Sequence, residues 1–206
     1  MKFTEDNTTI VHEIGHFIFF TLFLSSKSNF GKEMFCENVG EISIVPNYTE
    51  KSLGHITINE LQLKNNKLCC CFVLLSGVLT SLLIVNHEWN TDFNTVYDIR
   101  DNYVEIYCNH GGSEDLKKVF DIRNTLGSVP SHIFELEKII YYLWDQEIIR
   151  KITRKLYRRL QKEKVLYSES CYSIIEPYIP ELIKLGKSIY RFRTKLRINA
   201  RTILFQ

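Results

Sequence analysis

Residues 8–20, TTIVHEIGHFIFF, contain the side chains whose types and spacing could do chemistry. His12 and His16 are four residues apart, so on a helix both imidazoles lie on one face and can bind a single metal ion. Glu13 would stand beside the ion, where its carboxylate could accept a proton from water. The H-E-x-x-H spacing is typical of hydrolysis with Zn²⁺, because zinc lowers the pKa of a bound water towards neutrality. The alternative is two ordinary histidines, but a chance H-E-x-x-H in a chain of this length is an event of roughly one per cent. The sequence therefore favours a zinc site with Glu13 as its catalytic base.

The elements that must position these side chains follow from local patterns. Residues 6–9, DNTT, are typical helix N-cap residues, and they predict a helix over 7–25 that carries the H-E-x-x-H. Two alternating segments, 40–46 and 53–58, predict a small antiparallel pair of strands. The apolar segment 60–86 predicts a buried helix. The last third of the chain shows further helical periodicity, so the expected fold is mainly α with a small β element.

Two apolar stretches invite comparison with membrane spans. Residues 17–24 are too few, and residues 68–85 hold 18 residues without a charge, at the lower limit for a span. We expect both to be core helices. The first eleven residues lack the basic and apolar pattern of a signal peptide. The six cysteines contain no C-x-x-C pair, and three are contiguous at 69–71, which favours reduced thiols and a cytoplasmic location.

Charge divides the chain into two unlike parts. Residues 1–132 hold 10 Lys/Arg and 16 Asp/Glu, a net −6, whereas residues 133–206 hold 16 and 8, a net +8, which gives the overall +2. With the GSVPS turn at 127–131, this predicts a core over 1–127 and a C-terminal helical bundle over 128–206, packed together as one unit.

The basic stretches of the bundle are RKITRKLYRRLQKEK and KSIYRFRTKLRINAR. They could contact nucleic acid, an acidic partner or a membrane surface. We favour instead a solvated helix face that partly neutralises the acidic N-terminal half.

A catalytic zinc usually has three protein ligands, so a third must lie beyond the H-E-x-x-H. The segments TTIVHEIGHFI, VGEISIVPNYTEKSLGHITI, FVLLSGVLTSLLI and GGSEDLKKVFDIRNTLG follow one another in the order seen in the FtsH-type zinc peptidase domain. The chain resembles that family over residues 8–127. The resemblance implies that Asp115, in EDL, is the third zinc ligand. Glu114 is its rival, and Asp121 and Glu88 are more distant alternatives.

The chain departs from the family pattern in three places. Residues 86–110 look like an insertion between the second histidine and Asp115, Ser76 and Gly77 replace a pair of glycines, and Glu114 stands where the family usually has asparagine.

The resemblance implies a zinc-dependent endopeptidase that hydrolyses flexible or unfolded polypeptides. The 206 residues contain no G-x-x-x-x-G-K-[ST], so we expect activity without ATP, or an unfoldase supplied by a separate chain. Family members form rings, which implies a homo-oligomer. Three alternatives stay open: an intramembrane metalloprotease, a repressor-associated zinc peptidase whose third ligand is a glutamate, and a regulatory or binding protein that uses its basic C-terminal helices.

Overall fold

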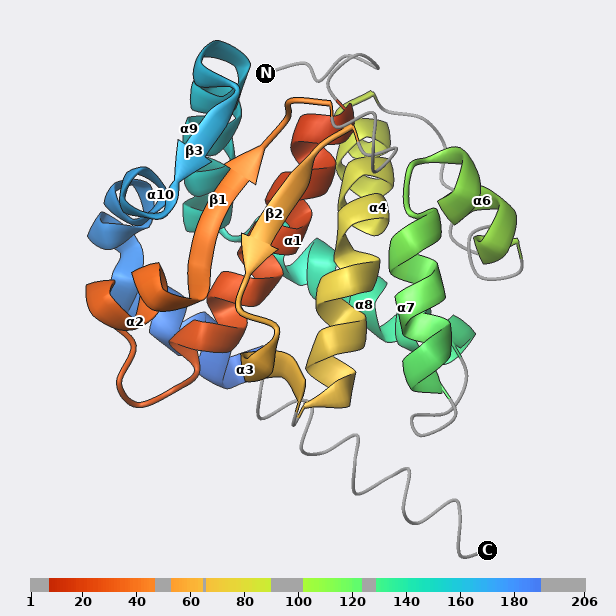
Figure 1. Ribbon diagram of the computed structural model, residues 1–206, viewed down its shortest axis with the longest axis horizontal. Helices are drawn as coiled ribbons and strands as arrows, with labels where there is room; N and C mark the ends of the chain where they lie inside the picture. Colours follow the sequence, from red (N-terminus) through yellow and green to blue (C-terminus); the bar gives the residue numbers. More distant parts are fainter. Residues whose placement is uncertain (1–7, 47–52, 65, 90–101, 124–128, 190–206) are drawn as a thin grey trace, which may run out of the picture.

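The computed structural model describes residues 8–46, 53–64, 66–89, 102–123 and 129–189. Helices form most of this part of the chain, and a three-stranded antiparallel sheet lies along one side of them (Figure 1). The expected fold class, mainly α with a small β element, is confirmed.

Two apolar helices, α1 (Thr8–Ser25) and α4 (Lys67–Trp89), pack side by side at the centre of the molecule (Figure 1). Helix α1 is apolar on nearly all sides, as expected for a helix surrounded by other elements. By length and composition both helices could cross a membrane. However, 83% of the apolar window of α1 and 67% of that of α4 is buried inside the protein, as in the core helices of soluble proteins.

The sheet lies against α1 and has the strand order β2-β1-β3. Strands β1 (Val39–Ser43) and β2 (His55–Ile58) form the predicted antiparallel pair, with Ile42 opposite Ile56. Strand β3 (Val165–Tyr167) pairs with the other side of β1 and was not predicted, because three residues are too few to show an alternation. Strand β2 therefore forms one edge of the sheet.

The predicted helix over 60–86 is divided, which corrects that expectation. A single turn, α3 (Leu61–Lys64), precedes α4, and Asn66 caps the longer helix. The Asn66 carbonyl accepts from the amide of Cys70 at 3.0 Å, and its side-chain oxygen accepts from the amide of Cys69 at 3.4 Å. A side chain that satisfies free amides in this way begins a new helix.

The described residues of the N-terminal part also contain three short helices: α2 (Lys32–Asn38), α6 (Tyr103–Asn109) and α7 (Ser113–Arg123). Helix α6 lies within the predicted insertion. Ser113, followed by Glu114 and Asp115, has the residue type of a helix N-cap, and the sequence therefore predicts a helix capped by Ser113. In the structure the amide of Leu116 donates to the carbonyl of Gly112 at 2.9 Å, so the capping residue is Gly112, one position earlier.

The C-terminal bundle consists of α8 (Val129–Asp145), α9 (Glu147–Glu163), α10 (Ser168–Ile175), the 3₁₀ turn η2 (Glu176–Tyr178) and a helical segment at 179–189. The apolar periodicity of residues 136–156 predicts one helix face. These apolar residues are buried, but they belong to two helices, α8 and α9, which are separated at Gln146. Helix α8 packs on α4 and α9 packs on α1, so one hydrophobic core includes residues of both halves. The predicted boundary at residue 127 and the end of the last predicted helix lie outside the described residues.

Candidate metal centre

Three side chains from two helices converge beside α4. His12 and His16 come from α1, and Asp115 comes from the first turn of α7. The His12 and His16 Nε2 atoms are 3.0 Å apart, and the Asp115 Oδ2 lies 3.6 Å from the first and 3.3 Å from the second. Both histidines are buried and the Asp115 side chain is 20% exposed. The residues predicted as the ligand set thus meet at one point, although they are up to 103 positions apart in the sequence.

These distances suit a zinc ion. Nitrogen and oxygen ligands lie about 2.0–2.1 Å from zinc, so neighbouring ligands of a tetrahedral site are about 3.3 Å apart. The three observed separations, 3.0, 3.3 and 3.6 Å, bracket that value. Two imidazoles and one carboxylate also form a ligand set that zinc accepts, with a fourth position open to water.

A hydrogen bond from α4 orients the second histidine. The His16 Nδ1 lies 2.6 Å from the carbonyl oxygen of Val73, to which it donates its proton. This bond fixes the tautomer, so the Nε2 lone pair is directed towards the cluster. The Ser76 hydroxyl donates to the same carbonyl at 2.7 Å. Sequence patterns contain no signal for this contact, because its acceptor is a main-chain oxygen 57 residues away.

Gly77 leaves room for the two imidazoles. A Cβ atom at this position would lie 2.6 Å from the His16 Cε1 and 2.7 Å from the His12 Nε2, closer than any carbon can approach. One glycine therefore suffices where the family pattern has two, since the side chain of Ser76 points elsewhere, to the Val73 carbonyl.

Glu13 is buried beside the cluster. Glu13 is 5% exposed. It packs against Gly54, just before β2, since a Cβ atom on Gly54 would lie 3.1 Å from the Glu13 Cγ. Burial raises the pKa of Glu13, while the neighbouring histidines oppose this rise. A carboxylate whose pKa is raised towards neutral is a better general base than an ordinary one.

Glu114, the rival third ligand, faces away from the cluster. Its side chain is 74% exposed and lies 3.8 Å from the Lys117 Nζ, on the outer side of α7. Asp121 is likewise exposed on α7, and the side chain of Glu88 lies outside the described part of the chain. Within the described residues, His12, His16 and Asp115 are the group of potential ligands that converges.

The charges of the cluster predict how zinc affinity depends on pH. Burial lowers the pKa of His16, but the Asp115 carboxylate, with contributions from Glu13 and from the Val73 carbonyl, raises it overall to about 9. A zinc ion must replace this proton, so we expect the apparent zinc affinity to rise about tenfold per pH unit up to pH ~9 and then to level off. Competition with a chromophoric chelator between pH 6.5 and 9.5 measures the slope. An affinity that does not change between pH 7 and 8.5 would contradict the expectation.

The raised pKa of His16 has the opposite effect on the stability of the metal-free protein, which should decrease as the pH rises. Because the pKa of His16 is raised from 6.5 to about 9, the stability that its protonation contributes is complete below pH 6.5. That stability is lost as the pH rises through about 9. The melting temperature of metal-free protein should therefore fall over the pH range in which zinc affinity rises.

A second histidine–carboxylate pair lies on the sheet. The His55 Nε2 lies 3.1 Å from the Glu41 Oε1, across strands β2 and β1, and both side chains are partly exposed. No pattern of neighbouring residues predicts this pair, because a diagonal pair across two strands becomes visible only once the register is known.

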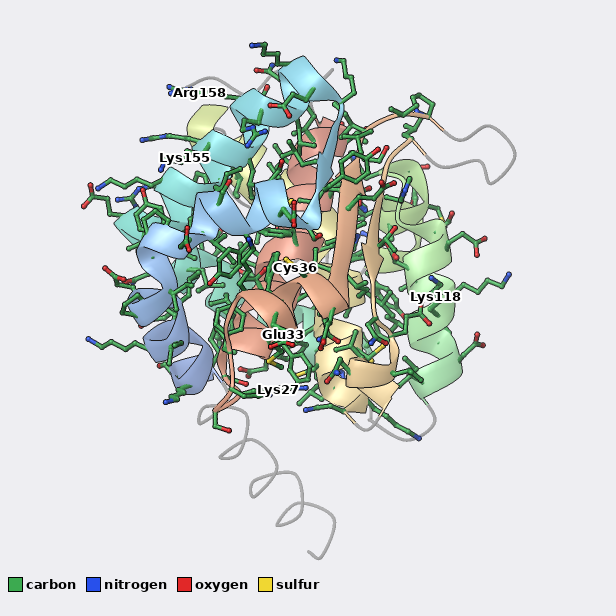
Figure 2. The ribbon with its side chains drawn as sticks, turned by 60° about the vertical axis from the view of Figure 1, so that its left-hand side comes forward. Lys27, Glu33, Cys36, Lys118, Lys155 and Arg158 are labelled. Atoms are coloured by element: carbon green, nitrogen blue, oxygen red, sulfur yellow. The ribbon has the colours of Figure 1, made fainter. Side chains whose placement is uncertain are left out.

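The basic face of α9 points to solvent. Figure 2 shows Lys155 and Arg158 directed outward from this helix. Its recorded ion pairs are internal: Lys151 with Glu147 at 2.8 Å, and Arg159 with Glu163 at 2.7 Å. Among the described residues, α9 forms no recorded ion pair with the acidic N-terminal half.

The sequence matches no protein-family model, and no curated protein matches it.

Proposed function

We propose that this chain is a zinc-dependent endopeptidase of the FtsH type that cleaves flexible or unfolded polypeptides in the cytoplasm. One observation carries the proposal: the three predicted ligands converge at zinc-like separations, with a buried glutamate beside them. The alternative of a repressor-associated peptidase requires a glutamate as third ligand. Glu114, the candidate for that role, points to solvent.

Each residue of the centre has a distinct part in this proposal. His12, His16 and Asp115 would hold the ion, which would polarise the scissile carbonyl and lower the pKa of water. Glu13 would accept the proton of the attacking water and then donate it to the leaving amine. Its buried position keeps the carboxylate close to the cluster, and its raised pKa helps it to act in both directions.

The edge of the sheet offers a place for the substrate. Strand β2 is an edge strand of the sheet (Figure 1), and Gly54, the residue immediately before it, lies against the Glu13 side chain. An extended polypeptide could pair with this edge through main-chain hydrogen bonds, which tolerate many side-chain sequences. Most strands of a folded protein are already paired within their own sheets, so an unfolded segment can occupy this edge more readily. We therefore propose unfolded substrates, with a separate unfoldase for folded ones.

Metal removal tests the proposal. We expect zinc-loaded protein to cleave reduced and alkylated serum albumin but not native albumin, without ATP. Treatment with 1,10-phenanthroline should abolish cleavage, and added zinc should restore it. Fragments are followed by gel electrophoresis and mass spectrometry. Cleavage that survives complete metal removal, or zinc-loaded protein that cleaves no unfolded substrate, would refute the proposed activity.

A further inference from the structure

Tyr107 is a fully buried tyrosine within residues 86–110, the predicted insertion. It lies on α6 with an exposed fraction of 0%. A buried hydroxyl needs a hydrogen-bond partner, and this one donates to the carbonyl oxygen of Leu75 on α4 at 2.8 Å. The bond joins α6 to the central helix α4.

The backbone connects Tyr107 directly to the helix of the third ligand. The amide of Gly112 donates to the Tyr107 carbonyl at 2.8 Å, and the amide of Leu116 donates to the Gly112 carbonyl at 2.9 Å. Gly112 also packs against the tyrosine ring, since a Cβ there would lie 2.9 Å from the Tyr107 Cδ1. The corner between α6 and α7 is therefore held to Tyr107, and Asp115 follows within one turn.

Helix α4 thus fixes the cluster from two sides. Its Val73 carbonyl accepts from His16, and its Leu75 carbonyl, two residues further on, accepts from Tyr107. A helix carbonyl can accept these second bonds because its oxygen has two lone pairs. Burial raises the pKa of the Tyr107 hydroxyl well above its ordinary value, so the hydroxyl stays protonated and can donate this bond.

We propose that Tyr107 is a positioning residue for the metal centre: its hydroxyl anchors the α6–α7 corner to α4 and so places Asp115 opposite the two histidines. Residues 103–110 of the predicted insertion would then serve the site itself. This inference rests on the proposed zinc site. The inference predicts that removing the Tyr107 hydroxyl, which does not bind the ion, weakens zinc binding.

The test compares two tyrosines that are buried to the same degree. Tyr107→Phe removes the hydroxyl and keeps the ring. Tyr157→Phe is the matched control, because Tyr157 on α9 is 2% exposed and its hydroxyl accepts from Gln161 at 3.1 Å. Zinc affinity is measured by chelator competition, and the d–d spectrum of the Co²⁺-loaded protein reports the ligand geometry.

We expect Tyr107→Phe to weaken zinc binding about 10- to 100-fold, as losses of an outer-shell bond do, and to alter the Co²⁺ spectrum. The Tyr157→Phe variant should match wild type in both measurements. Equal affinities and spectra for all three proteins would overturn the role of Tyr107 while leaving the zinc site intact. An equal loss in both variants would also overturn it, because the effect would then be general. Wild-type protein that binds no zinc would refute the proposed function itself.

Discussion

Replacing Glu13 by glutamine is expected to leave zinc bound and to abolish peptide hydrolysis. Glutamine has nearly the same size and shape, so it can occupy the buried position beside the cluster without a cavity. It cannot accept a proton, and a positioned general base contributes about 10²–10⁴-fold to rate. We therefore expect kcat to fall by that factor while the zinc content stays at one ion per chain.

The two measurements for this variant are elemental mass spectrometry of the purified protein and initial rates on the unfolded substrate. Glu60→Gln provides the control, because Glu60 is 73% exposed and its recorded partner is Lys118, at 4.0 Å. The control should retain both zinc and activity. Normal turnover by Glu13→Gln would exclude Glu13 as the base, whereas loss of zinc together with activity would show that the carboxylate helps to build the site.

The sequence predicted the local part of the candidate site. Helical spacing alone places His12 and His16 on one face, and the structure has this helix within one residue of its predicted start. The antiparallel pair of strands was predictable for the same reason, since alternation is a property of neighbouring residues. Asp115 required the resemblance to a family, because spacing along the chain carries no information about a ligand that joins from another helix.

The remaining features depend on contacts between distant segments. Strand β3 is too short for a pattern and forms because Leu166 lies beside Ile42 in the sheet. The separation of α8 from α9 left no mark in the apolar periodicity, because both helices bury the same kind of face. The bond that orients His16 and the bond made by Tyr107 both end on main-chain carbonyls of α4. Any residue presents such a carbonyl, so side-chain patterns cannot reveal it.

Replacing Asp115 by alanine is expected to remove zinc from the protein. The variant loses one of three ligands and the only carboxylate of the described cluster, so the affinity should fall by more than the 10- to 100-fold typical of outer-shell losses. The metal-free protein should change as well, because Asp115 makes the largest of the contributions that raise the pKa of His16 against the effect of burial. Without it, the pKa of His16 falls, and the dependence of stability on pH between 6.5 and about 9 should weaken.

Glu114→Ala is the control that decides between the two adjacent carboxylates. Glu114 and Asp115 both belong to the first turn of α7 and interact alike with the helix dipole. Replacing either one should therefore remove the same dipole contribution to stability. Glu114 differs in direction, since its side chain is 74% exposed beside Lys117. Zinc kept by Glu114→Ala and lost by Asp115→Ala would identify Asp115 as the third ligand and favour the FtsH-type peptidase. The reverse result would require the first turn of α7 to rotate, would make the ligand a glutamate and would favour the repressor-associated peptidases. Zinc kept by both variants would show that neither carboxylate alone is required for zinc binding, which would contradict the role proposed for Asp115.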